Sequence, residues 1–179
     1  MRLYRWEEFL WVKGSKGGKH VSMAKIENFE RRELSVGDTV IDGLFTGLLA
    51  GLGMAAVLVL AGWTAGEQPA QVLSRFAPQQ LNAPLSGFLL HLAVSGIYGM
   101  VYGVIWMLVL RLRGFRPSLP VALVSGAAYG LLLEGLAQAV LLPGSGSALG
   151  QTPFWHLALA HLVYGIILGL LLYRVQLNK

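Results

Sequence analysis

The chain has 179 residues, of which 55% are hydrophobic and 13% are charged, a composition that excludes an ordinary soluble domain and is typical of an integral membrane protein. Because the chain contains no cysteine, disulfides and thiolate metal ligands are also excluded. The formal net charge is +5, and we expect the basic residues to face anionic lipid headgroups. The sequence has no motif that recognises a nucleic-acid groove, so we expect no nucleic acid as a partner.

Residues 1–35 hold most of the charge and are expected to form a cytoplasmic, basic and partly amphipathic arm. Leu3, Trp6 and Leu10 share one helical face, which predicts a short helix lying in the membrane interface. Met23 offers an alternative start, in which case the residues before it would not belong to the protein.

Four apolar stretches follow, each long enough to cross the hydrocarbon core of a bilayer as a helix. Ser35, with Asp38 three residues later, is typical of a helix N-terminus. The predicted spans form a transmembrane domain over residues 36–174 and run over about 40–63, 85–110, 119–142 and 153–173. In the polar loop after the first span, residues 70–76 predict a short amphipathic turn.

Lysine and arginine are concentrated in residues 1–35, in the loop between the second and third spans, and at the C-terminus, with Arg75 as the exception. Because cytoplasmic loops carry an excess of these residues, we expect both termini in the cytoplasm, with residues 175–179 as a short tail. Aromatic residues near the span ends are expected to anchor them at the interface. These residues are Trp63, Trp106, Trp155 and Tyr173.

Each predicted span carries small residues at every fourth position, which places them on one helix face. In lipid such stripes let helix backbones approach closely, so we expect glycine-rich helix contacts in a compact all-α bundle. The glycines concerned are Gly43, Gly47, Gly51, Gly99, Gly103, Gly126, Gly130, Gly165 and Gly169. Because the stripes also suit contacts between chains, we expect a homo-oligomer or a place in a larger membrane complex.

Glu134 is the only charged residue of the third span. A carboxyl group there costs on the order of 2.5–3.5 kcal/mol on insertion scales, so it is expected to face the bundle interior and find a partner. With spans of alternating direction, His91 and His161 fall at the same depth, roughly 9–12 Å below the outer boundary at about 1.5 Å per residue. Ser95 lies deeper and Gln138 nearer the surface. These five residues form the predicted intramembrane polar layer.

The polar layer is compatible with several roles. It can fix helix register through a hydrogen bond between histidine and carboxylate, or it can carry protons or ions. His91, Glu134 and His161 also match the ligand types of a zinc or iron site. Two histidines at matched depth could hold haem, although tight glycine stripes leave little room for a porphyrin. The metal and the cofactor are therefore left open.

A resemblance rests on the stripe from Gly43 to Gly51 and on the sequences HLAVSGIYGMVYG (residues 91–103) and HLVYGIILG (residues 161–169). Over about residues 36–173 the chain resembles uncharacterised small four-helix integral membrane proteins of bacteria. The resemblance implies a multi-pass protein of the bacterial cytoplasmic (inner) membrane. It brings no functional residues with it and has no counterpart of the N-terminal arm.

Catalytic motifs are missing from the sequence. There is no phosphate-binding loop, and neither Ser95 nor Ser125 lies in a nucleophile elbow. We therefore expect a non-enzymatic protein, a small membrane subunit or scaffold that packs through its small-residue stripes with itself or with a larger membrane complex. The alternatives are a proton-coupled carrier or channel that uses the Glu/His layer, and a haem- or metal-binding redox subunit.

Overall fold

The computed structural model describes residues 35–77, 83–113, 118–143 and 148–178. In this part of the chain every element is a helix, which confirms the all-α prediction. The elements are α1 (Val36–Thr64), α2 (Pro69–Ser74), α3 (Pro84–Arg113), α4 (Leu119–Leu136), the π-helix η4 (Ala137–Leu141), the 3-10 helix η5 (Ala148–Gln151) and α5 (Phe154–Leu177). The N-terminal arm and its predicted interfacial helix lie outside the described residues.

Within the described residues four helices are long and apolar enough to cross a membrane, namely α1, α3, α4 with η4, and α5. This confirms the prediction of a multi-pass helical protein at the level of helix length and composition. The helices extend beyond the apolar stretches, since α1 already begins at Val36 and α5 continues to Leu177. Helical hydrogen bonding thus continues into the polar flanks, which hydropathy alone does not mark.

Local signals explain where two helices begin. The Ser35 hydroxyl accepts a hydrogen bond from the Gly37 N–H at 3.2 Å, so the predicted helix start at Ser35 is confirmed. The turn predicted over residues 70–76 is the short helix α2, which begins with a proline and a capping box between Gln68 and Gln71. The backbone N–H of Gln68 donates to the Gln71 side chain at 2.9 Å.

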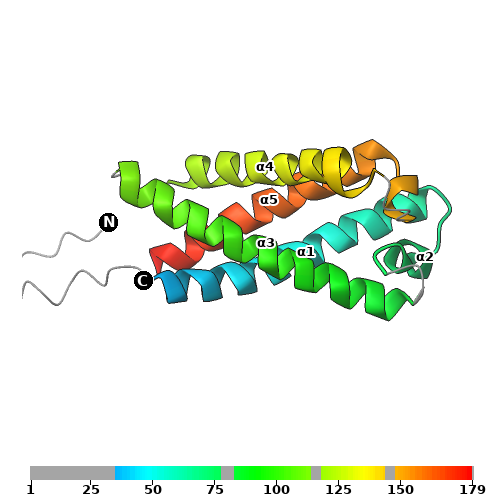
Figure 1. Cartoon of the computed structure of the whole chain (residues 1–179), viewed down its shortest axis with the longest axis horizontal. Coiled ribbons are helices and arrows are strands. Elements are labelled where there is room, and N and C mark those ends of the chain that lie inside the picture. Colours follow the sequence, from blue (N-terminus) through cyan, green and yellow to red (C-terminus); the bar gives the residue numbers. More distant parts are fainter. Residues whose placement is uncertain (1–34, 78–82, 114–117, 144–147, 179) are drawn as a thin grey trace, which may run out of the picture. The chain divides into compact units, whose positions relative to one another are not determined.

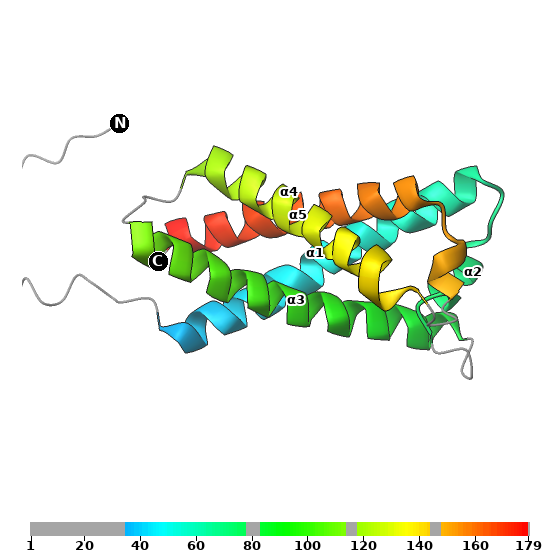
Figure 2. The same ribbon diagram turned by 45° about the horizontal axis from the view of Figure 1, so that its top comes forward.

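The long helices pack in two close pairs, α1 with α3 and α4 with α5, and α1 also packs along α5 (Figures 1 and 2). Over their described lengths α3 and α4 make no comparably close backbone contact. One end of the bundle holds the first residues of α1 and α4 and the last residues of α3 and α5 (Figure 1). The other end, where α2 lies, is called the α2 end below.

Glycines mediate the contact between α1 and α3. A methyl group on Gly43 would overlap the Gly99 carbonyl oxygen, and one on Gly99 would overlap that of Gly43. One turn towards the α2 end, Gly47 and Gly51 are opposite Ser95. Gly103 has the Thr39 carbonyl oxygen opposite it in the same way. The two backbones can therefore approach only because these side chains are missing.

The contact between α4 and α5 is built in the same way. Methyl groups on Gly126 and Gly165 would each overlap the other residue's carbonyl oxygen, while Gly130 meets the backbone of His161 and Gly169 that of Ala122. The stripes are thus occupied within the chain, and in this arrangement they are not available to another subunit.

Trp106 was expected to anchor a span end at the interface, and this expectation is wrong. Its side chain is 2% exposed, and its Nε1–H donates to Gln176 Oε1 on α5 at 2.7 Å. The reason is helical spacing, because Trp106 lies four residues after the buried Tyr102 and so shares its inward face. Trp63 and Trp155 are exposed near helix ends.

Candidate functional site

A cavity of about 280 Å³ lies in the half of the bundle nearer the α2 end. Helices α1, α3, α4, η4 and α5 all contribute to its wall, which is mainly apolar. The polar side chains in the wall are His91, Ser95, Tyr98, Glu134, His161 and Tyr164. Four members of the predicted polar layer therefore face one cavity, and the fifth, Gln138, is hydrogen-bonded to Glu134.

Glu134 is 3% exposed and occupies the centre of the polar contacts. Its Oε1 accepts a hydrogen bond from Gln138 Nε2 at 2.8 Å, and its Oε2 lies 2.8 Å from His161 Nδ1. The hydrogen on that nitrogen is directed elsewhere, to the Leu157 carbonyl oxygen at 2.9 Å. Glu134 Oε2 is consequently left without a hydrogen-bond donor among the described residues. Buried polar atoms in this condition are rare and call for an explanation.

The helix that carries this carboxyl group changes type shortly after it. Glu134 and Gln138 are four residues apart and so meet on one face of the helix. From Ala137 the helix is wider, and the N–H of Leu142 bonds to the Ala137 carbonyl oxygen at 2.9 Å, five residues back. Short π-helical segments of this kind are frequent at functional sites. Ala137 and Leu141, on the widened segment, line the cavity.

His91 faces the same cavity but is bound differently. Its Nε2 lies 3.0 Å from the Gly51 carbonyl oxygen of α1, and its ring lies 4.5 Å from that of Phe76. The Ser95 hydroxyl donates to the His91 carbonyl oxygen at 2.8 Å. The structure therefore brings Glu134 within 2.8 Å of one of the two predicted histidines, His161, and hydrogen-bonds the other to a neighbouring backbone.

Three tyrosines form hydrogen bonds between the helices around the site. They were not among the site residues predicted from the sequence. Tyr164 of α5 donates to the Ser95 carbonyl oxygen at 2.7 Å, and Tyr129 of α4 donates to that of Tyr98 at 2.8 Å. Tyr102 lies 2.9 Å from the Ser125 hydroxyl. The signal in the sequence is that Tyr102, Tyr129 and Tyr164 each precede a stripe glycine.

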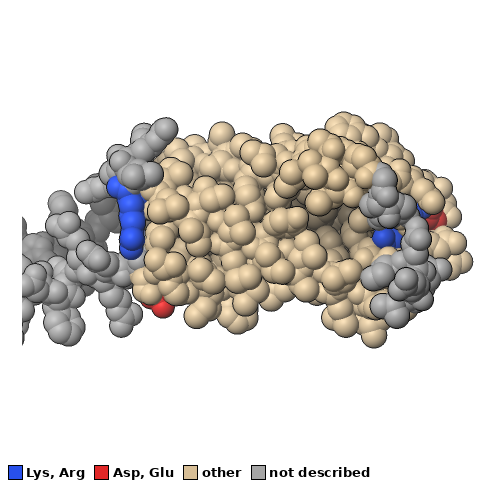
Figure 3. Space-filling model, viewed as in Figure 1, with Lys and Arg blue, Asp and Glu red and all other residues tan. Residues whose placement is uncertain are grey.

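The cavity opens sideways between α3 and η4. Leu90 and Val94 of α3 and Leu141 of η4 line it and are also exposed. Figure 3 shows a hollow in the surface between these two elements. On the face seen there, charged side chains lie near the two ends of the helices and the surface between them is uncharged. A molecule dissolved in a bilayer could therefore reach the polar groups without passing through water.

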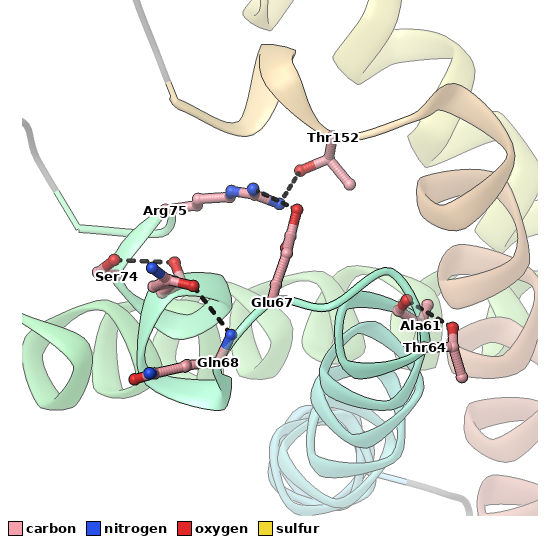
Figure 4. A network of polar contacts seen from close by, with 8 residues as sticks. Ala61, Thr64, Glu67, Gln68, Ser74, Arg75 and Thr152 are labelled. Carbon is pink, nitrogen blue, oxygen red and sulfur yellow. Dashed lines mark hydrogen bonds and ion pairs between the residues drawn. The ribbon is translucent and has the colours of Figure 1, made fainter.

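A polar network lies at the α2 end of the bundle (Figure 4). Arg75 Nη2 lies 2.8 Å from Glu67 Oε1, and Arg75 Nη1 donates to the Thr152 hydroxyl at 3.4 Å. Phe76, the next residue, covers the ring of His91, and Leu149 of η5 also lines the cavity. This network gives Arg75, the one basic residue outside the predicted cytoplasmic segments, a local partner.

His156 is buried next to a second, much smaller cavity of about 10 Å³. Glu67, Arg75 and Thr152 line the same cavity, and Glu67 Oε2 has no hydrogen-bond partner in the described part of the chain. A space of this size holds about one water molecule. His156 is thus separate from the Glu134 cavity.

The described residues contain no group of three or more His, Asp or Glu side chains placed to hold a metal ion, so the ligand set of His91, Glu134 and His161, one of the alternatives left open, is not assembled. An apolar wall, a side opening and a few convergent polar groups are instead the features of a small-molecule pocket. The cavity volume of about 280 Å³ is near the lower limit of about 300 Å³ for such pockets. No protein-family model, curated protein or solved structure matches the chain.

Proposed function

We propose that this chain binds a small hydrophobic molecule, taken up from the bilayer, in the cavity beside Glu134. The observation that carries the proposal is the side opening between α3 and η4, which leads from an apolar surface to a buried polar end. The role is binding or transport without catalysis, and it develops the expectation of a carrier that uses the Glu/His layer. Nothing in the geometry favours a redox role.

The proposal includes an orientation and a membrane. Arg111 and Arg174 lie in the helix ends opposite the α2 end, and residues 1–35 add further basic charge. By the positive-inside rule both termini are then cytoplasmic, and the cavity lies in the outer half of the membrane. The resemblance to small bacterial membrane proteins supports the inner membrane of a bacterium. Reporter fusions at Gly66 and after Asn178 test this, and an inward-facing reporter at Gly66 would overturn it.

Photolabelling tests the binding function. The full chain in lipid nanodiscs is exposed to a dodecanol probe that carries a photoreactive diazirine in its tail. We expect saturable labelling of cavity residues, abolished by Val94→Trp, which places a large ring in the opening. Val124→Trp is the matched control, because Val124 is exposed on α4 and is not among the described residues that line the cavity. Even, unsaturable labelling of exposed apolar residues would contradict the proposal.

A second candidate is the expected subunit or scaffold of a larger membrane assembly. What favours it is α4, which packs closely only on α5 and leaves many large apolar residues exposed. The partner would contact this outward face, since the glycine stripes are already occupied. Light scattering of the chain purified in mild detergent distinguishes the two candidates. A particle with the mass of a single chain and no co-purified protein would exclude this second role.

A further inference from the structure

The two histidines in the cavity wall direct their ring hydrogens away from the cavity. His91 Nε2 is 3.0 Å from the Gly51 carbonyl oxygen, and His161 Nδ1 is 2.9 Å from that of Leu157. A carbonyl oxygen can only accept a hydrogen bond, so each of these nitrogens carries the hydrogen. In a neutral imidazole the other ring nitrogen is then an acceptor.

Two of the three hydroxyl groups in the cavity wall, those of Ser95 and Tyr164, follow the same pattern. Ser95 Oγ donates to the His91 carbonyl oxygen at 2.8 Å, and the Tyr164 hydroxyl donates to the Ser95 carbonyl oxygen at 2.7 Å. Each hydroxyl hydrogen is therefore already used, while lone pairs on the oxygen remain.

Glu134 completes an acceptor-rich surface. Its carboxyl group is 3% exposed and lines the cavity, and Gln138 satisfies only Oε1. Oε2 has no donor from any residue that the structure describes, although it lies 2.8 Å from a histidine nitrogen. A ligand that brought an N–H or O–H group to this oxygen would supply the missing hydrogen bond.

We infer that the cavity selects molecules with a hydrogen-bond-donating head on an apolar body. The preferred head is a primary ammonium, and Glu134 binds it. The inference rests on the proposed binding function. An ammonium group offers three donors, and a charge-assisted bond to a carboxylate is stronger than a bond between neutral groups. A trimethylammonium head has the charge but no N–H donor. A carboxylate head would place a second negative charge beside Glu134.

Competition against the photoreactive dodecanol probe tests this selection. The competitors share one tail and differ in the head: dodecylamine, dodecanol, dodecyltrimethylammonium and dodecanoate. With concentrations expressed per lipid, we expect dodecylamine to compete about tenfold better than dodecanol. The trimethylammonium compound should be weaker than dodecylamine, and dodecanoate should be the weakest. Dodecanoate as the best competitor would show that Glu134 presents a hydrogen instead of accepting one, and would overturn the inference.

A pair of variants assigns the selectivity to one carboxylate. Glu134→Gln should retain competition by dodecanol and lose the preference for dodecylamine. Glu67→Gln removes a carboxylate that lines the small second cavity, and it should keep that preference. If Glu134→Gln does not fold, the ranking of the four heads on the unaltered chain still decides. Equal competition by all four heads overturns the inference alone, whereas absence of saturable labelling overturns the proposed function as well.

Discussion

Glu134 Oε2 and His161 Nδ1 lie 2.8 Å apart on two different helices, yet no hydrogen lies between them, because the imidazole N–H is directed to Leu157. The distance would allow a salt bridge only with a protonated imidazole, and the Nδ1–H makes its hydrogen bond to Leu157 instead. A hydrogen bond weakens steeply when its angle is poor. The carboxyl group is therefore held in place by Gln138 and is open on its other oxygen.

Glu134→Gln should change the free energy of unfolding by no more than about 1 kcal/mol, the size of one ordinary hydrogen bond. The amide keeps an acceptor for Gln138 and replaces an oxygen that lacks a donor. Glu134→Ala should cost about 1–3 kcal/mol, because it leaves Gln138 unpartnered and opens a void. Unfolding by denaturant in detergent micelles measures both. Equal losses in the two variants would mean that Glu134 and His161 form a genuine ion pair.

Gly126→Ala should destabilise the chain by about 1–3 kcal/mol, because the added methyl group would overlap the Gly165 carbonyl oxygen and force α4 away from α5. Gly135→Ala is the matched control on the same helix, where a methyl group meets no described atom within 4 Å. The mass of the particle should stay the same in both variants, because the contact is internal. A change of mass in Gly126→Ala alone would show that the stripe also joins two chains.

Tyr164→Phe should cost about 1 kcal/mol, since it removes the hydrogen bond to the Ser95 carbonyl oxygen and leaves the ring in place. Tyr173→Phe is the comparison, because the structure gives the Tyr173 hydroxyl no hydrogen bond within the described residues. Thermal unfolding in detergent measures both. If the two variants lose the same stability, the bond between α5 and α3 contributes nothing measurable.

The four long helices and the polar residues His91, Ser95, Glu134 and His161 of the cavity could be predicted from the sequence. Their hydrogen-bond partners and the tyrosines of the cavity wall could not. Apolar length marks a span, and spacing places Glu134 and Gln138 on one face. The sequence does not show that His91 binds the Gly51 backbone, because that depends on how closely two glycine stripes approach. The sequence also does not indicate the side opening, since the opening arises from the spacing of α3 and α4 and from the widened turn after Leu136. Trp106 was placed wrongly because hydropathy indicates the depth of a residue in the membrane and does not show which face of the helix it lies on.

The network at the α2 end should control local opening more than global stability. Arg75 and Glu67 are partly exposed, with side chains 19% and 28% accessible, so their ion pair contributes at most about 1 kcal/mol to the free energy of unfolding. Arg75→Gln should therefore unfold almost like the unaltered chain. Hydrogen exchange should nevertheless become faster in residues 67–77, which lose their link to Thr152, and stay unchanged in α5.

Glu67→Gln should also make hydrogen exchange faster in residues 67–77. The double variant should add little to this effect, because both changes break the same ion pair. Unaltered exchange in residues 67–77 would show that Phe76 packing on His91, and not the ion pair, holds this end closed.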